Sequence, residues 1–510
     1  MPSLGPLKLD EVQFKAASKD GNVLVVAGPG AGKTRTLLGR VLFLLENGVL
    51  PENIFLLTFT VKAASELRER LERLGIQGVQ VDTFHGLAYE ICRLKGLNPR
   101  LIDSQEQERI FREVLKEKGL PQRGVRKKLE KLLTDSMEED LFLSYQRILS
   151  RENLWDFHRL IKEAVSVNPL KDVPCHLLID EFQDLNPELI SFLRSFGQAR
   201  FYLVGDPAQA IYGFRGARPE VVKNFLTTLE GLETLFLPKS YRVPEKILNF
   251  ALGLREAPFE LPPLKAERSG GELLAFSYQN PQQEARAVAR QVEELLGGLQ
   301  METSHRGLSP GEIAVVARVR KILGPLREAF EALGIPVEES TSFKENHLSQ
   351  LEEIFSQAES LKGLKRRLRE SDILFPELSF ILAKSQDLKE FQIRWQLLRL
   401  QATVFLRKKG VALLTIHETK GLEFKAVFLI GAEEGLLPFQ LLEGCDFSEE
   451  KRLAYVAVTR AEAIFRASFV KRRVLFGKRL PGRISPFFQS LPQTQTTWLK
   501  PRRPRQKGLF

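Results

Sequence analysis

A glycine-rich turn between an apolar strand and a helix constrains the fold of this 510-residue chain more than any other feature. The segment at residues 23–38 reads VLVVAGPGAGKTRTLL. Glycines let backbone N–H groups converge on phosphate oxygens, and the following helix directs its positive end at them. Lys33 would neutralise the β- and γ-phosphates of a nucleotide, while the Thr34 hydroxyl would bind Mg²⁺. Ala27 stands where such loops usually have their first glycine. A nucleotide site is predicted here, with a glycine-rich turn that binds no nucleotide as the alternative.

A second apolar run ends in two neighbouring carboxylates. Residues 177–187 read LLIDEFQDLNP, so Asp180 and Glu181 follow a strand at the edge where open α/β sheets bind ligands. Asp180 is expected to hold Mg²⁺, and Glu181 to orient and deprotonate an attacking water. Alone, such a pair is often a plain surface feature. Together with the phosphate loop, it predicts hydrolysis of a nucleoside triphosphate.

Short apolar runs alternate with amphipathic stretches along the chain, which is typical of a parallel sheet flanked by helices. The fold class is therefore α/β, in two halves that are each interrupted by a short helical insertion. The insertions are residues 99–172 and 356–410, which are charged and helical in period. Strands are expected at residues 22–27, 54–58, 176–179, 201–204, 232–237, 273–276, 313–317, 411–416 and 427–430, and helices at residues 33–47, 63–73 and 281–296.

The charge of the chain is concentrated at its end. The sequence has 75 Lys and Arg against 64 Asp and Glu, a net charge of +11, and residues 471–510 hold eleven basic residues and no acid. The remaining residues balance, so whole-chain basicity does not argue for a nucleic-acid partner. The final WLKPRRPRQKGLF is expected to be a poorly ordered tail that attracts DNA or a protein partner, with a mere solubility tail as the alternative.

No targeting or membrane signal stands out. No apolar run approaches the ~20 residues that span a bilayer, and the first residues lack a basic region followed by an apolar core. The cysteines, Cys92, Cys175 and Cys445, are odd in number and far apart, which excludes a disulfide framework and a Cys-x-x-Cys metal site. We expect a cytoplasmic protein without a membrane partner.

Seven further sequence motifs occur along the chain, the first of them ahead of the phosphate loop. They read LDEVQFKAA, LLTFTVKAASELRERL, TFH, LVGDPAQAIYGFRGA, LPKSYRVP, LLTIHETKGLEFKAVFLIG and EEKRLAYVAVTRAEA. Each is degenerate alone, but in this order the chain resembles the UvrD/Rep/PcrA group of superfamily 1 DNA helicases over nearly its whole length. The resemblance implies two RecA-like P-loop domains that use ATP and Mg²⁺. It also implies 3′-to-5′ movement on single-stranded or tailed duplex DNA, in repair, recombination or replication restart.

The resemblance assigns roles around the nucleotide. Gln13 would read the adenine, Tyr241 and Arg35 would flank it, and Glu423 would contact the ribose or nearby phosphates. Phosphoryl transfer also needs positive charge near the transition state, which Arg242 and Arg460 would supply, with ATP between the two halves. Ordinary structural salt bridges are the alternative for both arginines. The implied ATP-binding residues are Gln13, Ala27, Gly28, Pro29, Gly30, Ala31, Gly32, Lys33, Thr34, Arg35, Tyr241 and Glu423, and the catalytic ones are Lys33, Glu181, Gln209, Arg242 and Arg460.

Single-stranded DNA binding needs aromatic platforms and groups that contact phosphates. Phe214 stands where the family often has tryptophan, so weaker base stacking is expected there. For His85 and His417 a structural role is the alternative. The positions that match the DNA contacts of the family are Thr58, Phe59, Thr83, His85, Tyr212, Phe214, Thr415 and His417.

The chain departs from the family in two ways. Pro207 and Ala208 replace an acidic pair, a variant that resembles the RecB/AddA side of the group, while Asp206 and Gln209 remain. The insertions are also short, so translocation on single strands is a safer expectation than processive unwinding. The expected domains are 1A at residues 1–98 and 173–251, 1B at 99–172, 2A at 252–355 and 411–490, a reduced 2B-like insertion at 356–410, and the basic tail at 491–510.

The leading hypothesis is an ATP-dependent 3′–5′ DNA helicase and single-stranded DNA translocase. One alternative is the motor subunit of a recombination nuclease complex, whose nuclease would be a partner chain. Another is an ATP-dependent single-strand switch protein without autonomous unwinding, against which the intact set of Lys33, Glu181, Arg242 and Arg460 argues. A protein recruiter is compatible with either motor hypothesis, and the oligomeric state is not predicted.

Overall fold

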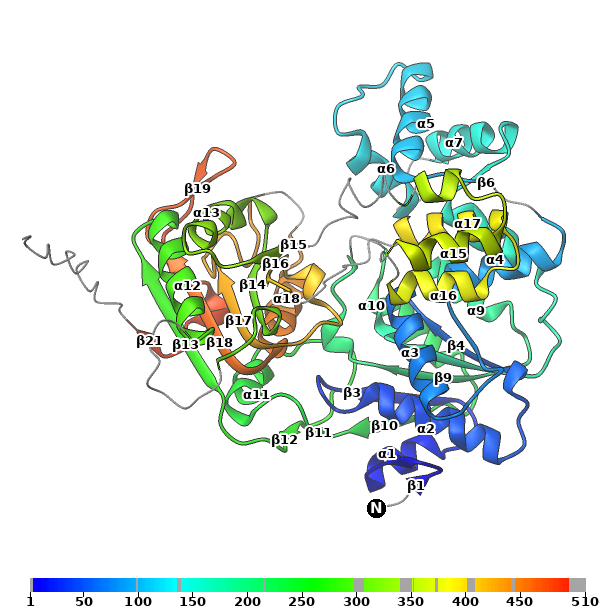
Figure 1. Ribbon diagram of the computed structural model, residues 1–510, viewed down its shortest axis with the longest axis horizontal. Helices are drawn as coiled ribbons and strands as arrows, with labels where there is room; N and C mark the ends of the chain where they lie inside the picture. The colour runs from blue at the N-terminus through cyan, green and yellow to red at the C-terminus, as the bar shows by residue number, and fades with distance from the viewer. Residues whose placement is uncertain are drawn as a thin grey trace, which may run out of the picture. The chain divides into compact units, whose positions relative to one another are not determined.

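The computed structural model divides the chain into two compact units (Figure 1). The first consists of Met1–Tyr241, Glu256–Lys265 and Thr341–Phe405, and the second of Arg242–Arg255, Ala266–Ser340 and Leu406–Phe510. The structure describes residues 3–97, 100–134, 139–213, 216–297, 307–339, 351, 353–371, 375–400, 409–441 and 445–494. Among the helices of these ranges, none is long and apolar enough to cross a bilayer.

The first unit is built on a six-stranded parallel sheet. Adjacent residues of its strands enter opposite cores, as the two-residue period of a strand requires. Val23 and Val25 pack with the helices α2 and α3, whereas Leu24 and Val26 pack with α4, α8, α9 and α10. Both faces are therefore covered, which explains why the strands are apolar without interruption. In sheet order the strands are β10 (Glu233–Leu237), β3 (Val23–Ala27), β9 (Ala199–Gly205), β8 (Cys175–Asp180), β4 (Ile54–Thr58) and β5 (Gln80–Thr83).

The helices that cover this sheet follow its strands along the chain. The first of them, α1, begins with a capping box, in which Asp10 and Gln13 satisfy each other's backbone N–H groups. The helices are α1 (Glu11–Ala17), α2 (Lys33–Glu46), α3 (Val61–Arg73), α4 (Phe84–Leu94), α8 (Phe157–Val167), α9 (Pro187–Arg194) and α10 (Pro219–Thr227).

The second unit contains a seven-stranded parallel sheet. Its helices α12 and α13 share a core with the inner strands, while α11 packs against α18. In sheet order the strands are β15 (Val337–Glu339), β16 (Val411–Thr415), β14 (Ile313–Ala317), β17 (Phe424–Ile430), β18 (Ala461–Val470), β13 (Glu272–Tyr278) and β21 (Gln493–Thr494). The helices are α11 (Glu245–Leu252), α12 (Pro281–Leu295), α13 (Gly324–Ala332) and α18 (Phe447–Thr459).

The structure confirms the α/β class and each expected strand, but it adds strands that the sequence did not predict. β18 follows α18 without an intervening glycine or proline, so nothing in the sequence marks the change from helix to strand. β5 is short and contains polar residues. Smaller two-stranded ladders join β1 (Ser3–Leu4) to β2 (Leu7–Lys8), β11 (Lys239–Ser240) to β12 (Lys265–Ala266), and β19 (Val474–Leu475) to β20 (Lys478–Arg479).

The expected domain limits differ from the observed units. Glu256–Lys265, which were assigned to domain 2A, belong to the first unit. The division falls after Tyr241, so α11 belongs to the second unit, whereas residues 173–251 were assigned to the first half. Within the tail expected from residue 491, Gln493 and Thr494 form β21 beside β13. Residues 495–510, which carry the last basic residues, lie outside the described part of the chain.

The first insertion forms a small helical subdomain with its own core, which includes Ile110, Phe111 and Tyr145. Its ends meet in a short parallel ladder that the sequence did not predict. The last helix of residues 99–172, α8, packs against α4 and belongs to the layer that covers the sheet. The elements are α5 (Ser104–Glu117), α6 (Val125–Thr134) and α7 (Glu139–Arg151), with the ladder of β6 (Arg100–Leu101) and β7 (Leu154–Trp155).

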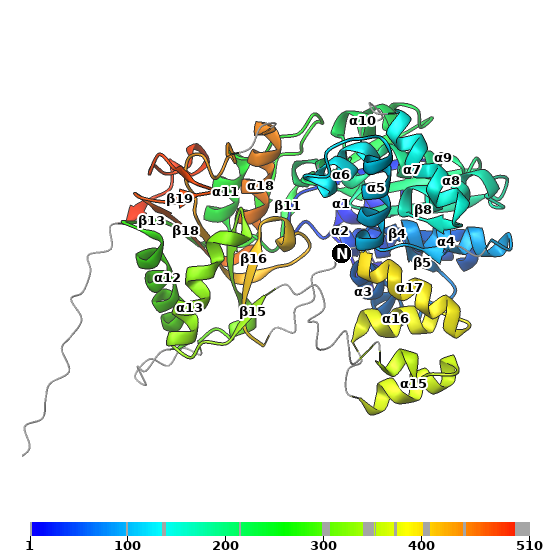
Figure 2. The same ribbon diagram turned by 90° about the horizontal axis from the view of Figure 1, so that it is seen from above.

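The second insertion is helical, as expected, but it packs on the other half of the chain. The residues before and after it belong to the second unit, while the insertion itself belongs to the first. Figure 2 shows α16 (Pro376–Lys384) beside α3 and α17 (Leu388–Leu400) beside α4. Phe380 and Trp395 of the insertion share a core with Leu67 and Leu71 of α3. The helices are α15 (Leu361–Glu370), α16 (Pro376–Lys384) and α17 (Leu388–Leu400).

Candidate functional site

The phosphate loop runs from the buried strand β3 into α2 and is held in a shape that requires glycine. Gly30 and Gly32 have φ angles of 71° and 83°, which L-residues with a side chain rarely adopt. A Cβ at Gly28 would lie 2.2 Å from Leu264. Lys33 and Thr34 stand on the first turn of α2 with the exposed Arg35 beside them. The start of α2 therefore offers backbone N–H groups, an ammonium group and a hydroxyl to an anion.

Two of the residues expected around an adenine, Gln13 and Tyr241, bond to the backbone of this loop. The Gln13 side chain is buried and donates from Nε2 to the carbonyl of Ala31 at 3.1 Å. Tyr241 donates its backbone N–H to the carbonyl of Gly30 at 2.9 Å, and its hydroxyl donates to Asp10. The structure thus brings Gln13, Tyr241 and the loop together, although residues 13 and 241 are far apart in sequence.

The carboxylate pair lies opposite the lysine of the loop. Lys33 Nζ is 3.2 Å from the Glu181 carboxylate. Glu181 has left-handed backbone angles, φ 56° and ψ 47°, a strained conformation that is typical of functional sites in non-glycine residues. Burial, reinforced by the neighbouring Glu181, raises the pKa of Asp180 to about 7. The protein groups around Asp180 therefore do not balance its negative charge fully, and a bound cation would do so.

Gln183 is a residue of this site that the sequence analysis missed. Its side chain donates to the Glu181 carboxylate at 2.5 Å, and its Oε1 accepts the backbone N–H of Asp206 at 3.1 Å. Asp206 in turn accepts from Gln209 Nε2 at 2.9 Å. A continuous chain of hydrogen bonds therefore joins Glu181 to Gln209. A Cβ at Gly205 would lie 2.1 Å from Gln183 Oε1, so this glycine makes room for the link. In the sequence, its place two residues after Glu181 was the only sign that Gln183 could belong to this site.

The expected DNA contacts of the first unit lie at the ends of β4 and β5. Thr58 and Thr83 are direct partners in the ladder between these strands. Phe59 packs against Phe84 with ring centroids 5.0 Å apart. Since all strands of the sheet are parallel, these residues occupy the same edge as the phosphate loop and the carboxylates.

The remaining aromatic positions differ in what the structure shows. The ring of His85 stacks on that of Phe157 at 4.1 Å, a neighbour that the sequence did not indicate. Tyr212 is half-buried just beyond η3 (Pro207–Gln209). Phe214 lies outside the described residues.

In the second unit, the structure brings together Arg242, Glu423 and the end of α18. Arg242 Nη1 donates to the Glu423 carboxylate at 2.5 Å, and its Nη2 donates to the carbonyl of Thr459 at 3.2 Å. Arg460 is buried and donates to the carbonyls of Val456 and Leu422 at 3.2 and 3.3 Å. Two guanidinium groups therefore meet at one end of α18. The ion pair between Arg242 and Glu423 is a contact of the kind that the alternative role for Arg242, a structural salt bridge, predicts.

The two expected DNA contacts of the second unit also lie at the end of a strand. Thr415 closes β16, where its backbone N–H and hydroxyl donate to the Glu418 carboxylate at 2.7 and 2.9 Å. His417 follows at the start of η7 (His417–Thr419). Both residues stand at the carboxyl edge of the second sheet, as Thr58 and Thr83 do in the first.

Comparison with protein families explains this arrangement. The N-terminal domain of UvrD/REP helicases matches residues 9–143 and 104–230, and the UvrD-like helicase C-terminal domain matches residues 337–471. The chain belongs to the UvrD-like helicase family. It is an ATP-dependent DNA helicase with two RecA-like domains, as the order of its motifs predicted.

Curated relatives of this UvrD-like helicase match over most of its length. DNA helicase II of Escherichia coli K12 is 26% identical over 95% of this chain and 87% of its own. DNA helicase II of Salmonella typhimurium is 27% identical over the same shares. The ATP-dependent DNA helicase PcrA of Staphylococcus epidermidis is 25% identical over 93% of this chain and 85% of its own.

Proposed function

We propose that this UvrD-like helicase binds ATP at the phosphate loop and couples its hydrolysis to 3′-to-5′ movement along single-stranded DNA. The observation that carries the proposal is the hydrogen-bonded chain from Glu181 through Gln183 and Asp206 to Gln209. It links the carboxylate expected to activate water with the glutamine expected to report the γ-phosphate. A pathway in DNA repair or restart, a cytoplasmic location and a protein recruiter or nuclease partner remain parts of the proposal.

Within the ATP site, each side chain has a distinct task. The ammonium of Lys33 neutralises the terminal phosphates, and the Glu181 carboxylate orients the attacking water and accepts its proton. Thr34 and Asp180 offer a hydroxyl and a carboxylate, the oxygen donors that Mg²⁺ prefers. A bound Mg²⁺ would neutralise phosphate charge. Gln13 and Tyr241, which the loop itself positions, hold the base.

Arg242 and Arg460 are proposed to supply the positive charge that the transferring phosphate needs. Arginine suits this role because its planar guanidinium stays charged and can contact two phosphate oxygens at once. In the described structure both side chains are engaged, Arg242 with Glu423 and Arg460 with carbonyl groups. Their catalytic role would require these contacts to be exchanged for phosphate oxygens.

The DNA groups lie on the same sheet edge as the ATP groups, which supports coupling between them. Strand β8, which ends in Asp180, lies between β9 and β4 in the sheet. Glu181 is therefore one strand away from Thr58, and Gln209, which follows β9, is two strands away. Phe59 and His85 would stack on bases, while Thr58 and Thr83 would contact phosphates, with Thr415 and His417 acting in the second unit.

Steady-state ATP hydrolysis tests the proposed site. In the presence of single-stranded DNA, Lys33→Ala and Glu181→Gln should each lower turnover by about 100-fold or more, because each removes a group that acts on the transferring phosphate or the water. Glu52→Gln and Lys95→Ala, which lie away from the site, serve as controls. Equal turnover of the wild-type protein with and without DNA would contradict the motor function.

Strand displacement tests polarity and autonomy. We expect the purified protein to displace a strand from a duplex with a 3′ tail and not from one with a 5′ tail. DNA-stimulated hydrolysis without displacement from either substrate would instead indicate a translocase that unwinds only with a partner.

A further inference from the structure

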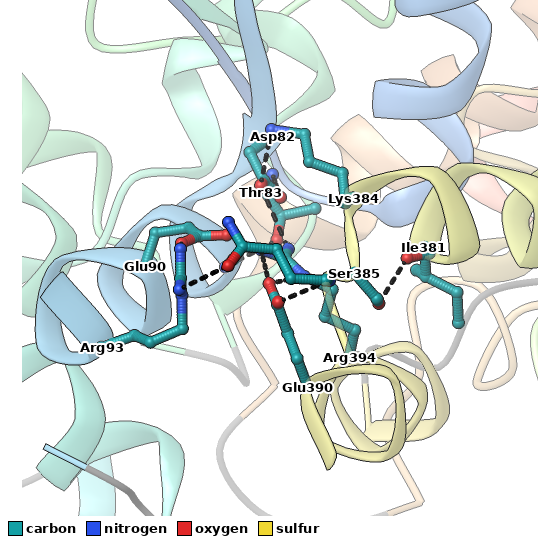
Figure 3. Close-up of polar contacts among 11 residues, drawn as sticks. Asp82, Thr83, Glu90, Arg93, Ile381, Lys384, Ser385, Glu390 and Arg394 are labelled. Carbon is teal, nitrogen blue, oxygen red and sulfur yellow. Dashed lines mark hydrogen bonds and ion pairs between the residues drawn. The ribbon is translucent and has the colours of Figure 1, made fainter. Parts of the chain in front are cut away.

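The insertion of the second half docks on the first unit through a buried cluster of charges (Figure 3). Lys384 Nζ lies 3.2 Å and Arg394 Nη1 3.4 Å from Asp82 Oδ2. Arg394 also donates from Nε to Glu390 at 3.0 Å and contacts Glu90. Asp82 and Glu90 belong to the first half of the chain and the other three residues to the insertion. Arg394 is only 2% exposed, so its contacts are removed from solvent.

The docking is a packed interface and extends beyond these charges. Ser65 of α3 donates its hydroxyl to the carbonyl of Pro376 at 3.1 Å. The Arg68 guanidinium lies 5.7 Å from the centre of the Phe380 ring, a cation–π distance. Phe380 and Leu378 are buried in the core shared with α3. The insertion is therefore fixed on α3 and α4 by apolar contacts as well as by ion pairs.

Asp82 connects this interface to the expected DNA contacts. Its Oδ1 accepts the backbone N–H of Thr83 at 2.8 Å. The Thr83 hydroxyl in turn accepts the backbone N–H of Gly86 at 3.0 Å and caps α4. A Cβ at Gly86 would lie 2.0 Å from Asp82 Oδ1, so the carboxylate fits directly against the first turn of α4. His85 lies on that turn, so the Asp82 side chain bonds to the backbone of Thr83 and packs against the turn that carries His85.

Lys384 and Arg394 stabilise the ionised form of the buried Asp82 carboxylate. Burial alone would oppose ionisation, but Lys384 and Arg394 hold the pKa of Asp82 below its ordinary value. Removal of one partner from a buried ion pair is strongly destabilising, because it leaves an uncompensated charge. Without the insertion, Asp82 would have to turn towards water or take up a proton, and either change would alter its bond to Thr83.

We propose that Arg394, assisted by Lys384, is a positioning residue for single-stranded DNA binding, which acts through Asp82 on Thr83 and the first turn of α4. This inference rests on the proposed function, in which Thr83 and His85 contact the strand. Binding groups must be held to about 0.5 Å by their supporting shell. The docked insertion, a segment supplied by the other half of the chain, would thus complete the DNA contact of the first unit.

The test compares the DNA dependence of ATP hydrolysis in the full chain. The variants are Arg394→Ala, Arg394→Lys and Lys384→Gln, and Arg367→Ala is the matched control. Arg367 belongs to the same insertion but bonds to Gln357 at 2.9 Å. An oligothymidylate is titrated, and its binding is measured in parallel by fluorescence anisotropy.

We expect Arg394→Ala to raise the half-saturating oligothymidylate concentration about five- to tenfold, with turnover at saturation little changed, since coupling through a supporting residue is of this size. Arg394→Lys should recover most of the affinity, Lys384→Gln should have a smaller effect, and Arg367→Ala none. Identical titrations for the wild type and Arg394→Ala would overturn the inference and leave the proposed function intact. A wild-type protein that neither binds the oligonucleotide nor responds to it would overturn both.

A double-mutant cycle covers the case in which Arg394→Ala fails to fold. Asp82→Asn removes the buried charge that Arg394 balances, so Asp82→Asn with Arg394→Gln should be no worse in oligothymidylate affinity than Asp82→Asn alone. Additive losses in the double variant would show that Arg394 does not act through Asp82 and would overturn the inference.

Discussion

Gln183 lies between Glu181, the carboxylate proposed to activate water, and the residues that follow β9. It is 1% exposed and bonds to Glu181 on one side and to the backbone of Asp206 on the other. The sequence does not mark it as a site residue, because a glutamine in a loop is neither an acid, a base nor a nucleophile. Its two hydrogen bonds and the close approach of Gly205 to its side chain show that the position is fixed.

Replacement of Gln183 by leucine should therefore lower DNA-stimulated ATP turnover by about tenfold. The variant removes the hydrogen bond of the buried Asp206 N–H and one of the bonds to the half-buried Glu181 carboxylate. Loss of a buried bond costs roughly 1–3 kcal/mol. Steady-state turnover over a DNA titration measures the effect, with the exposed Gln198→Leu as the control. Unchanged stimulated turnover would show that the hydrogen-bonded chain does not couple the two motifs.

A second residue, Glu433, should make the second unit sensitive to pH. It is fully buried and shares Arg473 with Glu284, which is bonded to Arg473 at 2.5 Å. Burial and the nearby Glu284 raise the pKa of Glu433 from 4.5 to about 7, although Arg473 opposes this shift. Between these values the folded chain holds a proton that the unfolded chain has released, so stability falls as pH rises through this window.

Glu433→Gln should remove this dependence, because an amide imitates the protonated acid. Relative to the variant, the wild type should lose up to about 3 kcal/mol of unfolding free energy between pH 4.5 and 7. Urea unfolding of both proteins at a series of pH values gives the difference. A difference that stays constant across this range would contradict the prediction.

At the scale of elements, the sequence predicted those strands best whose burial is complete. Residues 54–58 and 313–317 were placed correctly to the residue as β4 and β14, because each is an apolar run with no exposed side. The helices of the second insertion were also expected. Their partner was not, since an amphipathic helix shows only that its apolar face must be covered. That α16 is covered by α3, and not by the half from which it emerges, follows from side-chain fit.

Phe380→Ala tests whether α16 is held on α3 by apolar packing. The ring is 4% exposed and lies in the core shared with α3, so its removal should cost about 3–5 kcal/mol. We expect faster proteolysis within the insertion and a lower unfolding midpoint, measured by limited digestion and thermal denaturation. Phe476→Ala, at a ring that is 56% exposed, is the control. Equal digestion of both variants would contradict the packed interface.

At the scale of the whole molecule, most of the proposed site residues lie at the carboxyl edges of two parallel sheets. The sequence located these edges because each motif follows an apolar run, and a shared strand direction brings their ends to one side. It could not show the division of the chain, since linkers and unit boundaries leave weaker signals than buried strands. The boundary after Tyr241 separates two neighbouring residues of one motif, Tyr241 and Arg242, into different units.

The catalytic role proposed for the second unit is tested by Arg460→Ala and Arg460→Lys. If Arg460 supplies charge to the transferring phosphate, turnover should fall by about 1000-fold in the alanine variant, with partial recovery in the lysine variant. Thermal denaturation provides the check on folding, because Arg460 also bonds to carbonyls at the end of α18. Normal turnover in Arg460→Ala would refute a site that draws on both units.

The docked insertion also determines how the chain can be taken apart. The backbone passes from one unit to the other after Tyr241, Arg255, Lys265, Ser340 and Phe405. A single cut by a protease at any one of these passages leaves the units joined by the others. Neither unit can be expressed as one uninterrupted segment, so a ribosome must finish residue 405 before the first unit has its full complement of helices. The first half of this motor can therefore complete its fold only late in synthesis.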